Sequence, residues 1–243
     1  MHRDLPADLK IIRHPRATRF RLRLDRRDGR PVLTLPPGVS ERSGLAFVRQ
    51  HLDWLDARRA ARPQAQPFVD GMRFPLGDGT LRVVHRPASR GAPKRGEDDT
   101  LVVGGAAEHL NRRVVDWLRA EATRRLKERV RLHAAAIGET VARVRVADQS
   151  SRWGSCSGRR VLSFNWRLVF APATVLDYVA AHEVAHLKEM NHGPAFHRWL
   201  ARLHPDPHGA GRWLDANGAT LRRYGLPTAA SMAGSSSYSA SGR

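Results

Sequence analysis

Residues 179–196 read VAAHEVAHLKEMNHGPAF, and this stretch decides the fold and chemistry that we predict for the chain. His182 and His186 are four residues apart, slightly more than one turn of an α-helix, so both imidazoles project from one helix face. Two nitrogens on one face can reach a single zinc ion. Glu183 follows the first histidine and is placed to take a proton from a water at that ion. The pattern predicts a zinc-dependent hydrolase with Glu183 as its general base.

A third histidine would complete the three protein ligands that a catalytic zinc ion usually has. His192 follows His186 by six residues, just past the predicted end of the helix. Asn191 tolerates a positive φ, so it can end the helix there and turn His192 back toward the metal. His197, inside the next predicted helix, is the alternative third ligand. We predict His182, His186 and His192 as the metal ligands.

Periodicity outside this stretch predicts both strands and helices. The segment RFRLRL at 19–24 alternates arginine with apolar residues, which is typical of a strand with one buried face. Apolar residues that recur at helical spacing predict five helices. The predicted β segments are 10–36, 67–103, 143–146 and 161–164, with a polar loop at 89–99, and the predicted helices are 41–60, 106–136, 172–190, 194–203 and 210–224.

These elements predict an α+β fold in three parts. Residues 1–103 form a β-rich N-terminal region with one helix, and residues 104–226 form a zincin-like metal-binding hydrolase domain. The tail 227–243 is poor in apolar residues, so we expect it to be disordered.

Charge is the unusual feature of the composition. The chain of 243 residues has 42 basic and 23 acidic side chains and a net charge of +19, and nearly all of the basic residues are arginine. Such an excess favours an anionic partner, and nucleic acid could bind the basic surface through the strip Arg19, Arg21 and Arg23. A solvated basic surface is the alternative.

The apolar runs, the first residues and the cysteine count predict where in the cell the protein is found. No apolar run approaches the ~18 residues that cross a bilayer, so we expect no membrane partner. The start, MHRDLPADLK, is polar and lacks the apolar core of a signal peptide. The single cysteine, Cys156, fits a reducing compartment. We therefore expect a cytoplasmic protein.

Three polar residues before the zinc helix are candidate substrate-binding groups. Arg152 and Arg167 could stabilise an oxyanion or bind a substrate carboxylate or phosphate. Asn165 could hydrogen-bond the backbone of a substrate. For each arginine a salt bridge is the alternative, and Asn165 could equally brace its strand.

Taken together, these motifs resemble the YgjP-like zinc metallopeptidase family and, more distantly, SprT- and Spartan-type proteases. The resemblance rests on the HEVAH segment with Asn191–Phe196, on RWGSC at 152–156 and on LSFNWRL at 162–168. It extends to the N-terminal strand with its arginines and so covers about residues 10–226. It implies a zincin-type α+β fold, a zinc cofactor and a hydrolase mechanism. At His197 the family more often has an aromatic residue.

Three functions follow from these predictions. The first is a metallopeptidase that cleaves peptide bonds with a metal-activated water. The second is a metal-dependent hydrolase of an anionic small molecule such as a nucleoside triphosphate, although the chain has no Gly-rich P-loop. The third is a basic nucleic-acid-binding protein with a structural zinc site. Glu183 argues against the third, because a structural site needs no base.

Overall fold

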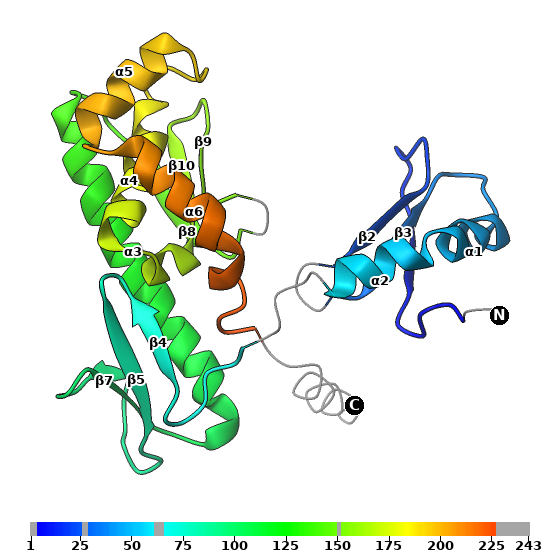
Figure 1. The fold of residues 1–243 in the computed structure, drawn as a ribbon, viewed down its shortest axis with the longest axis horizontal. Helices are drawn as coiled ribbons and strands as arrows, with labels where there is room; N and C mark the ends of the chain where they lie inside the picture. Colours follow the sequence, from blue (N-terminus) through cyan, green and yellow to red (C-terminus); the bar gives the residue numbers. More distant parts are fainter. Residues whose placement is uncertain (1–3, 26–28, 61–65, 150–151, 227–243) are drawn as a thin grey trace, which may run out of the picture. The chain divides into compact units, whose positions relative to one another are not determined.

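The computed structural model describes residues 4–25, 29–60, 66–149 and 152–226 (Figure 1). Contacts between Cα atoms divide the chain into two units, residues 1–64 and residues 65–243. We call them the N-terminal unit and the C-terminal unit and describe each by itself. The tail 227–243 lies outside the described residues.

The N-terminal unit is a three-stranded sheet with two helices. The sheet has the order β1-β3-β2, with β1 parallel and β2 antiparallel to β3. Alternate apolar residues of β3, Leu33 and Leu35, form a buried cluster with Val48 and Leu55 of the helices. The elements are β1 (Lys10–Arg13), β2 (Arg21–Leu24), β3 (Pro31–Leu35), α1 (Glu41–Gln50) and α2 (Leu52–Ala60).

Two details of this unit differ from the sequence prediction. The helix expected over 41–60 is broken at His51, whose φ of −116° and ψ of 18° end α1 before α2 begins. The strand β2 begins at Arg21, so Arg19 precedes it. Helix α1 begins after an N-cap at Ser40, whose side chain accepts a hydrogen bond from the backbone N–H of Ser43.

The C-terminal unit contains two sheets and four α-helices among its described residues. One sheet has the order β4-β5-β7-β6 and the other has the order β8-β10-β9. In the second sheet β8 is parallel and β9 antiparallel to β10. The elements are β4 (Arg73–Leu76), β5 (Gly79–His85), β6 (Lys94–Arg95), β7 (Thr100–Val103), η1 (Ala107–His109), α3 (Leu110–Ala136), β8 (Arg143–Ala147), β9 (Gly154–Cys156), β10 (Val161–Asn165), η2 (Trp166–Phe170), α4 (Ala173–Ala185), α5 (Pro194–Leu203) and α6 (Pro207–Leu221).

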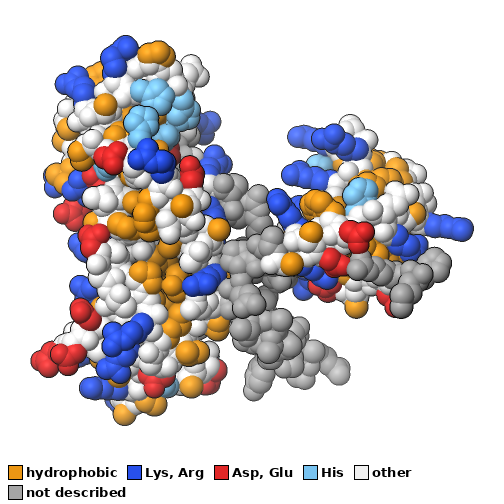
Figure 2. Space-filling view, viewed as in Figure 1, with side chains coloured by type: hydrophobic (Ala, Val, Ile, Leu, Met, Phe, Trp, Pro, Cys, Tyr) orange, Lys and Arg blue, Asp and Glu red, His pale blue; other side chains and the backbone are white. Residues whose placement is uncertain are grey.

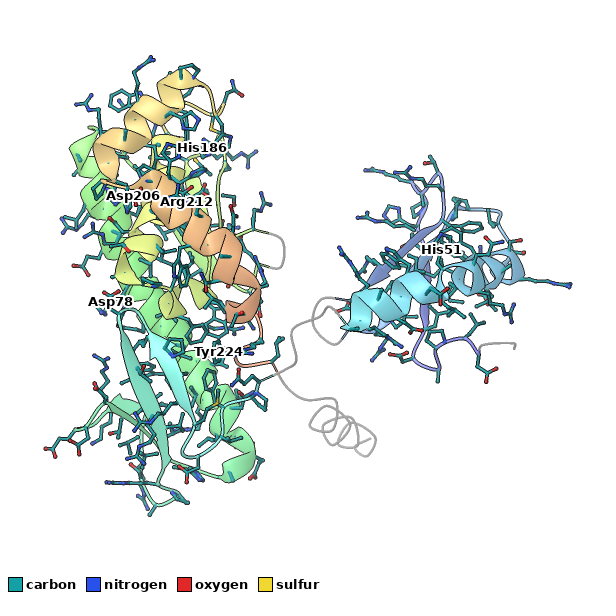
Figure 3. The ribbon with its side chains drawn as sticks, viewed as in Figure 1. His51, Asp78, His186, Asp206, Arg212 and Tyr224 are labelled. Atoms are coloured by element: carbon teal, nitrogen blue, oxygen red, sulfur yellow. The ribbon has the colours of Figure 1, made fainter. Side chains whose placement is uncertain are left out.

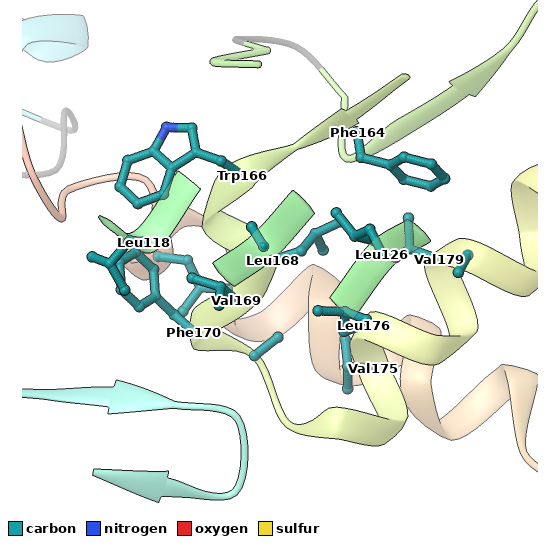
Figure 4. Close-up of a cluster of buried hydrophobic side chains, with 14 of the residues drawn as sticks. Leu118, Leu126, Phe164, Trp166, Leu168, Val169, Phe170, Val175, Leu176 and Val179 are labelled. Atoms are coloured by element: carbon teal, nitrogen blue, oxygen red, sulfur yellow. The ribbon is translucent and has the colours of Figure 1, made fainter. Parts of the chain in front are cut away.

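One buried core joins these elements around the long helix α3. Figure 4 shows Leu118 and Leu126 of α3 beside residues of η2 and of α4. Phe74 of β4 and Leu101 of β7 belong to the same core. The sequence prediction placed a boundary near residue 104, between β7 and α3. The compact units divide instead at residues 64 and 65, because β4–β7 pack on the core of α3.

The mixed architecture confirms the α+β prediction. The long helix α3 ends as expected: Gly138 has a φ of 66°, and the N–H of Glu139 donates to the carbonyl of Ala134. No helix in the described parts of the chain has the length and apolar character needed to cross a membrane.

Candidate metal centre

Helix α4 carries the centre, and polar contacts from two other elements fix its position. Asp78, in the turn between β4 and β5, accepts a hydrogen bond from the N–H of Ala173 at 3.1 Å and so caps the start of α4. Asp177 accepts hydrogen bonds from Arg129 and His133 of α3, each at 2.5 Å. These contacts, with the apolar faces of α4, hold the last turn of the helix in place.

Three histidines meet at that last turn and in the loop after it. His182, His186 and His192 each offer a ring nitrogen, and these ligand atoms all lie within 4.8 Å of one another. The Nε2 atoms of His182 and His192 are 3.1 Å apart. Figure 2 shows histidine side chains gathered on the surface of the C-terminal unit, and Figure 3 labels His186. The predicted ligands are therefore brought together.

The chain reaches His192 by a different turn from the one that we predicted. Helix α4 ends at Ala185, not near residue 190, and the N–H of Leu187 donates to the carbonyl of Val184. Asn191 does not adopt a positive φ. The turn is fixed by Glu189 instead: its carboxylate accepts from the N–H of Asn191 at 3.2 Å. Its backbone carbonyl lies 3.0 Å from Nδ1 of His186, which leaves Nε2 of that ring for a ligand role.

Phe196 forms the apolar support of the centre. Its buried ring lies 4.9, 4.6 and 4.7 Å from the ring centroids of His182, His186 and His192. The neighbouring His197 contacts Phe196 at 5.5 Å but does not belong to the group of three. This arrangement favours His192 over His197 as third ligand.

The protonation of the histidines fits a bound metal ion. Burial, with the neighbouring imidazoles, lowers the pKa of His182 to about 4, and burial also lowers the pKa of His186. Both rings are therefore neutral at pH 7, as metal ligands must be. Nδ1 of His182 is buried without a hydrogen bond among the described groups, and its Nε2 faces that of His192. A shared cation would accept the lone pairs of both Nε2 atoms at once.

Glu183 stands beside this group in an unusual environment for a carboxylate. Burial raises its pKa to about 8, and the positive charge of Arg152 opposes that rise. No described residue donates a hydrogen bond to its oxygens. Gly154 of β9 packs directly against it, since a Cβ atom added at Gly154 would lie 2.7 Å from Cγ of Glu183. A buried carboxylate without donors can act as a proton acceptor when a cation is near.

A pocket opens on Glu183 between α4, β9 and α6. Tyr178 contributes a ring that packs against His182 with centroids 5.8 Å apart, and burial raises the pKa of its phenol, so it remains a hydrogen-bond donor. Arg222 stacks over Trp153 at 4.3 Å. The residues that line the pocket are Trp153, Gly154, Tyr178, Val179, His182, Glu183 and Leu214.

The three predicted substrate-binding residues fall in two places. Arg152 is exposed and close enough to Glu183 to influence its pKa. Asn165 and Arg167 are buried and do not line the pocket. Arg167 donates to Asp148 at 2.5 Å and to the carbonyl of Tyr224 at 3.0 Å, and its N–H donates to Asn165 at 2.9 Å. Asn165 and Arg167 therefore form hydrogen bonds that stabilise η2 and its neighbouring segments.

The sequence did not identify Gly154, Phe196 and Glu189 as parts of the centre. No strand is predicted over Gly154, whereas it begins the edge strand β9. A glycine in a strand often marks close approach of another group, so a signal existed there. For Phe196, no local pattern distinguishes a core phenylalanine from one that supports three histidines.

Comparison with known proteins is consistent with this geometry. The family described as YgjP-like, metallopeptidase domain, matches residues 18–217. No curated protein matches the chain. Two solved structures are similar: the zymogen of Pyrococcus abyssi abylysin has 18% identity and a TM-score of 0.35, covering 41% of this chain and 97% of its own. The zymogen of Methanocaldococcus jannaschii jannalysin has 20% identity and a TM-score of 0.34, covering 38% and 88%. Both are described as metallopeptidases.

The family match spans most of the chain and includes the three histidines, the glutamate and the strands that precede them. The resemblance inferred from the sequence is confirmed, as is the prediction of a hydrolytic enzyme that uses a metal ion. This chain belongs to the YgjP-like family and carries its metallopeptidase domain.

Proposed function

We propose that the enzyme hydrolyses peptide bonds with a zinc ion held by His182, His186 and His192 and with Glu183 as general base. One observation carries the proposal: three imidazoles converge beside a buried carboxylate to which no described residue donates a hydrogen bond. A purely structural metal site has no use for that carboxylate.

The ligand set supports zinc among the common metals. Imidazole nitrogens suit zinc, whereas calcium and magnesium prefer oxygen ligands. Three protein ligands leave a fourth tetrahedral position for water or substrate. A zinc ion held there would supply a Lewis acid that polarises the scissile carbonyl and lowers the pKa of a water to about 7.

Glu183 then has the proton-transfer role. One carboxylate oxygen accepts the proton of the attacking water, and the same group donates that proton to the nitrogen of the leaving amine. Gly154 keeps the carboxylate in place, since its missing side chain lets β9 approach Glu183 closely. Tyr178 and Arg152 are the nearby donors for the oxygen on which negative charge develops.

We expect the substrate peptide to bind along β9. This strand is at the end of its sheet, with β10 on one side. An exposed edge strand can pair with an extended peptide through backbone hydrogen bonds. Gly154 lies on this strand and contacts Glu183, so a peptide bound there would pass beside the base.

Replacement of Glu183 tests the proposal. Zinc-loaded enzyme is incubated with a mixed peptide library and, separately, with nucleoside triphosphates. We expect peptide cleavage, reduced at least ~10²-fold by Glu183→Gln at unchanged metal content. Glu108→Gln makes the same chemical change at an exposed carboxylate of η1 that is not part of the centre, so it should keep activity within a few-fold.

Other results would reject specific parts of the proposal. Hydrolysis of nucleotides without peptide cleavage would replace the substrate class by an anionic small molecule. Full activity in Glu183→Gln would mean that another group takes the proton. Loss of the metal in that variant would make Glu183 a support of the metal site.

A further inference from the structure

The sheet of the N-terminal unit has two faces of different character. Leu33 and Leu35 point to the face that α1 and α2 cover. Strand alternation places the neighbouring Val32 and Thr34 on the opposite face, which we call the open face. Register then fixes its other members. One row across the strands is Lys10, Val32 and Arg23, and the next row is Ile12, Thr34 and Arg21.

Every charged residue of the open face is a cation. Lys10 is on one edge strand, and Arg21 and Arg23 are on the other. Arg21 and Arg23 are two residues apart, about 7 Å along the strand, and Lys10 is about 10 Å away across two strand spacings. No strand of this sheet contains an acidic residue, whereas α1 and α2 contain Glu41, Asp53 and Asp56 among their arginines.

These cations are not neutralised within the described part of the unit. Lys10 and Arg21 are exposed and form no ion pair with another described residue. Arg23 has a single long contact, 3.8 Å to Asp25, and its side chain is 43% exposed. Val32, between Lys10 and Arg23, is only 2% exposed. This fits long side chains whose stems cover apolar surface and whose charged heads reach water.

We propose that the open face binds the phosphate backbone of nucleic acid. Three cations within about 12 Å match roughly three phosphates, because each strand of a duplex carries one charge per ~3.4 Å of axis. The strands of this face carry no aromatic side chain on which the bases of a single strand could stack, so we expect the contacts to be with phosphates, which carry no sequence information. An acidic protein is the weaker partner, since protein interfaces rely on large aromatic anchors; this face has none among its strand residues, and its Val32 is buried. Figure 2 shows lysine and arginine side chains projecting from this unit.

The test measures binding of a fluorescent DNA duplex to the full chain by anisotropy at several salt concentrations. Lys10→Gln/Arg21→Gln/Arg23→Gln removes the open-face charges. Arg42→Gln/Arg49→Gln/Arg58→Gln removes three exposed charges from the helices and is the matched control, since both variants have the same net charge. We expect at least ~10-fold weaker binding at 50 mM salt for the first variant only, with a salt slope less steep by about 2–3.

The outcomes separate location from net charge. Equal weakening in both triple variants would overturn the proposal, as would an unchanged slope in the open-face variant. If that variant unfolds, the single variant Arg21→Gln replaces it in the test, because Arg21 is exposed and has no described ion pair. The salt slope of DNA binding should then be less steep by about 1. In a competition experiment, polyglutamate and unlabelled DNA are added at equal total charge. If polyglutamate displaces the labelled DNA as effectively as unlabelled DNA does, the open face binds acidic proteins instead. Peptide hydrolysis by the open-face variant should be unchanged, so this test is independent of the proposed function.

Discussion

Two groups of buried polar side chains in the C-terminal unit, one around η2 and one at the end of α4, differ in their hydrogen bonds. The first group is hydrogen-bonded to other residues of the protein, and the second is not fully hydrogen-bonded within the described residues. Around η2, Arg167 bonds Asp148 and the carbonyl of Tyr224, and Asn165 bonds neighbouring backbone. Around the end of α4, Nδ1 of His182 is buried without a hydrogen-bond partner among the described residues, and no described residue donates a hydrogen bond to the buried Glu183.

This difference indicates which of the two regions binds a ligand or takes part in catalysis. Polar groups that bond one another hold the fold together and leave nothing for a ligand. Unsatisfied buried groups cost stability, and they persist where a ligand or a reacting atom completes them. Sequence alone singled out both regions, and hydrogen bonding separates Arg167 and Asn165 from His182 and Glu183. In η2 the indole N–H of Trp166 is also buried without a partner among the described residues, but it is not an ionisable group.

The largest effect that we expect follows removal of a ligand in the unsatisfied region. His192→Ala should weaken metal binding by more than about 100-fold, because even residues that only orient a ligand are worth 10–100-fold. Metal content after dialysis against a weak chelator measures this. His197→Ala is the matched control and should keep its metal. The opposite pair of results would assign the third ligand to His197.

The second effect concerns how closely Glu183 is held. In Gly154→Ala the new Cβ would lie 2.7 Å from Cγ of Glu183, so the carboxylate must move. Small displacements of this kind can cost about 10²-fold in rate, and we expect that loss in peptide hydrolysis with the metal retained. Gly158→Ala is the control, because an added Cβ there meets nothing within 4 Å. Similar activities of the two variants would show that Gly154 does not position the base.

The sequence predicted the parts of this site that depend on local spacing. Two histidines four residues apart share a helix face wherever that helix lies, so His182, His186 and the position of Glu183 follow from the helix geometry. The end of α4 was predicted too late, because the contact from Glu189 to Asn191 replaces the expected asparagine turn. Local spacing describes helix faces better than helix ends.

Long-range packing could not be predicted in the same way. The contact of Gly154 with Glu183 joins residues far apart in sequence, and a single sequence contains no record of it. The same limit applies to β4–β7, whose burial against α3 places the division of the chain well before residue 104. For Arg167 and Asn165 the sequence leaves both a substrate-binding and a structural role open, because it does not report hydrogen-bond partners.

A third effect tests the satisfied region. Arg167→Met keeps the stem of a side chain that is 4% exposed but removes its hydrogen bonds and its contact with Trp166. We expect a loss of about 2–3 kcal/mol in the free energy of unfolding. Water can reach Asp148, which is 45% exposed, so the larger losses of fully buried pairs do not apply. Urea unfolding measures the change.

The activity of this variant completes the comparison. Per folded molecule, Arg167→Met should cleave peptides within about twofold of the unaltered enzyme. Arg159→Met removes an exposed arginine and should change stability by less than about 0.5 kcal/mol. A stable but inactive Arg167→Met would return Arg167 to the substrate-binding group.

The smallest effect contrasts two carboxylates. Glu121 on α3 accepts hydrogen bonds from Arg124 and Arg125, which lower its pKa to about 2, whereas burial without donors raises that of Glu183 to about 8. A carboxyl whose folded pKa lies below its unfolded value of ~4.3 binds fewer protons when folded. Glu121 therefore stabilises the protein above about pH 4.3, and this contribution is lost as pH falls through about 2. Because Arg124 is 63% exposed, we expect about 1 kcal/mol. Urea unfolding of Glu121→Gln should show a deficit of that size at pH 6 that vanishes near pH 2. A deficit that stays constant over this range would mean that Glu121 acts through packing and not through its charge.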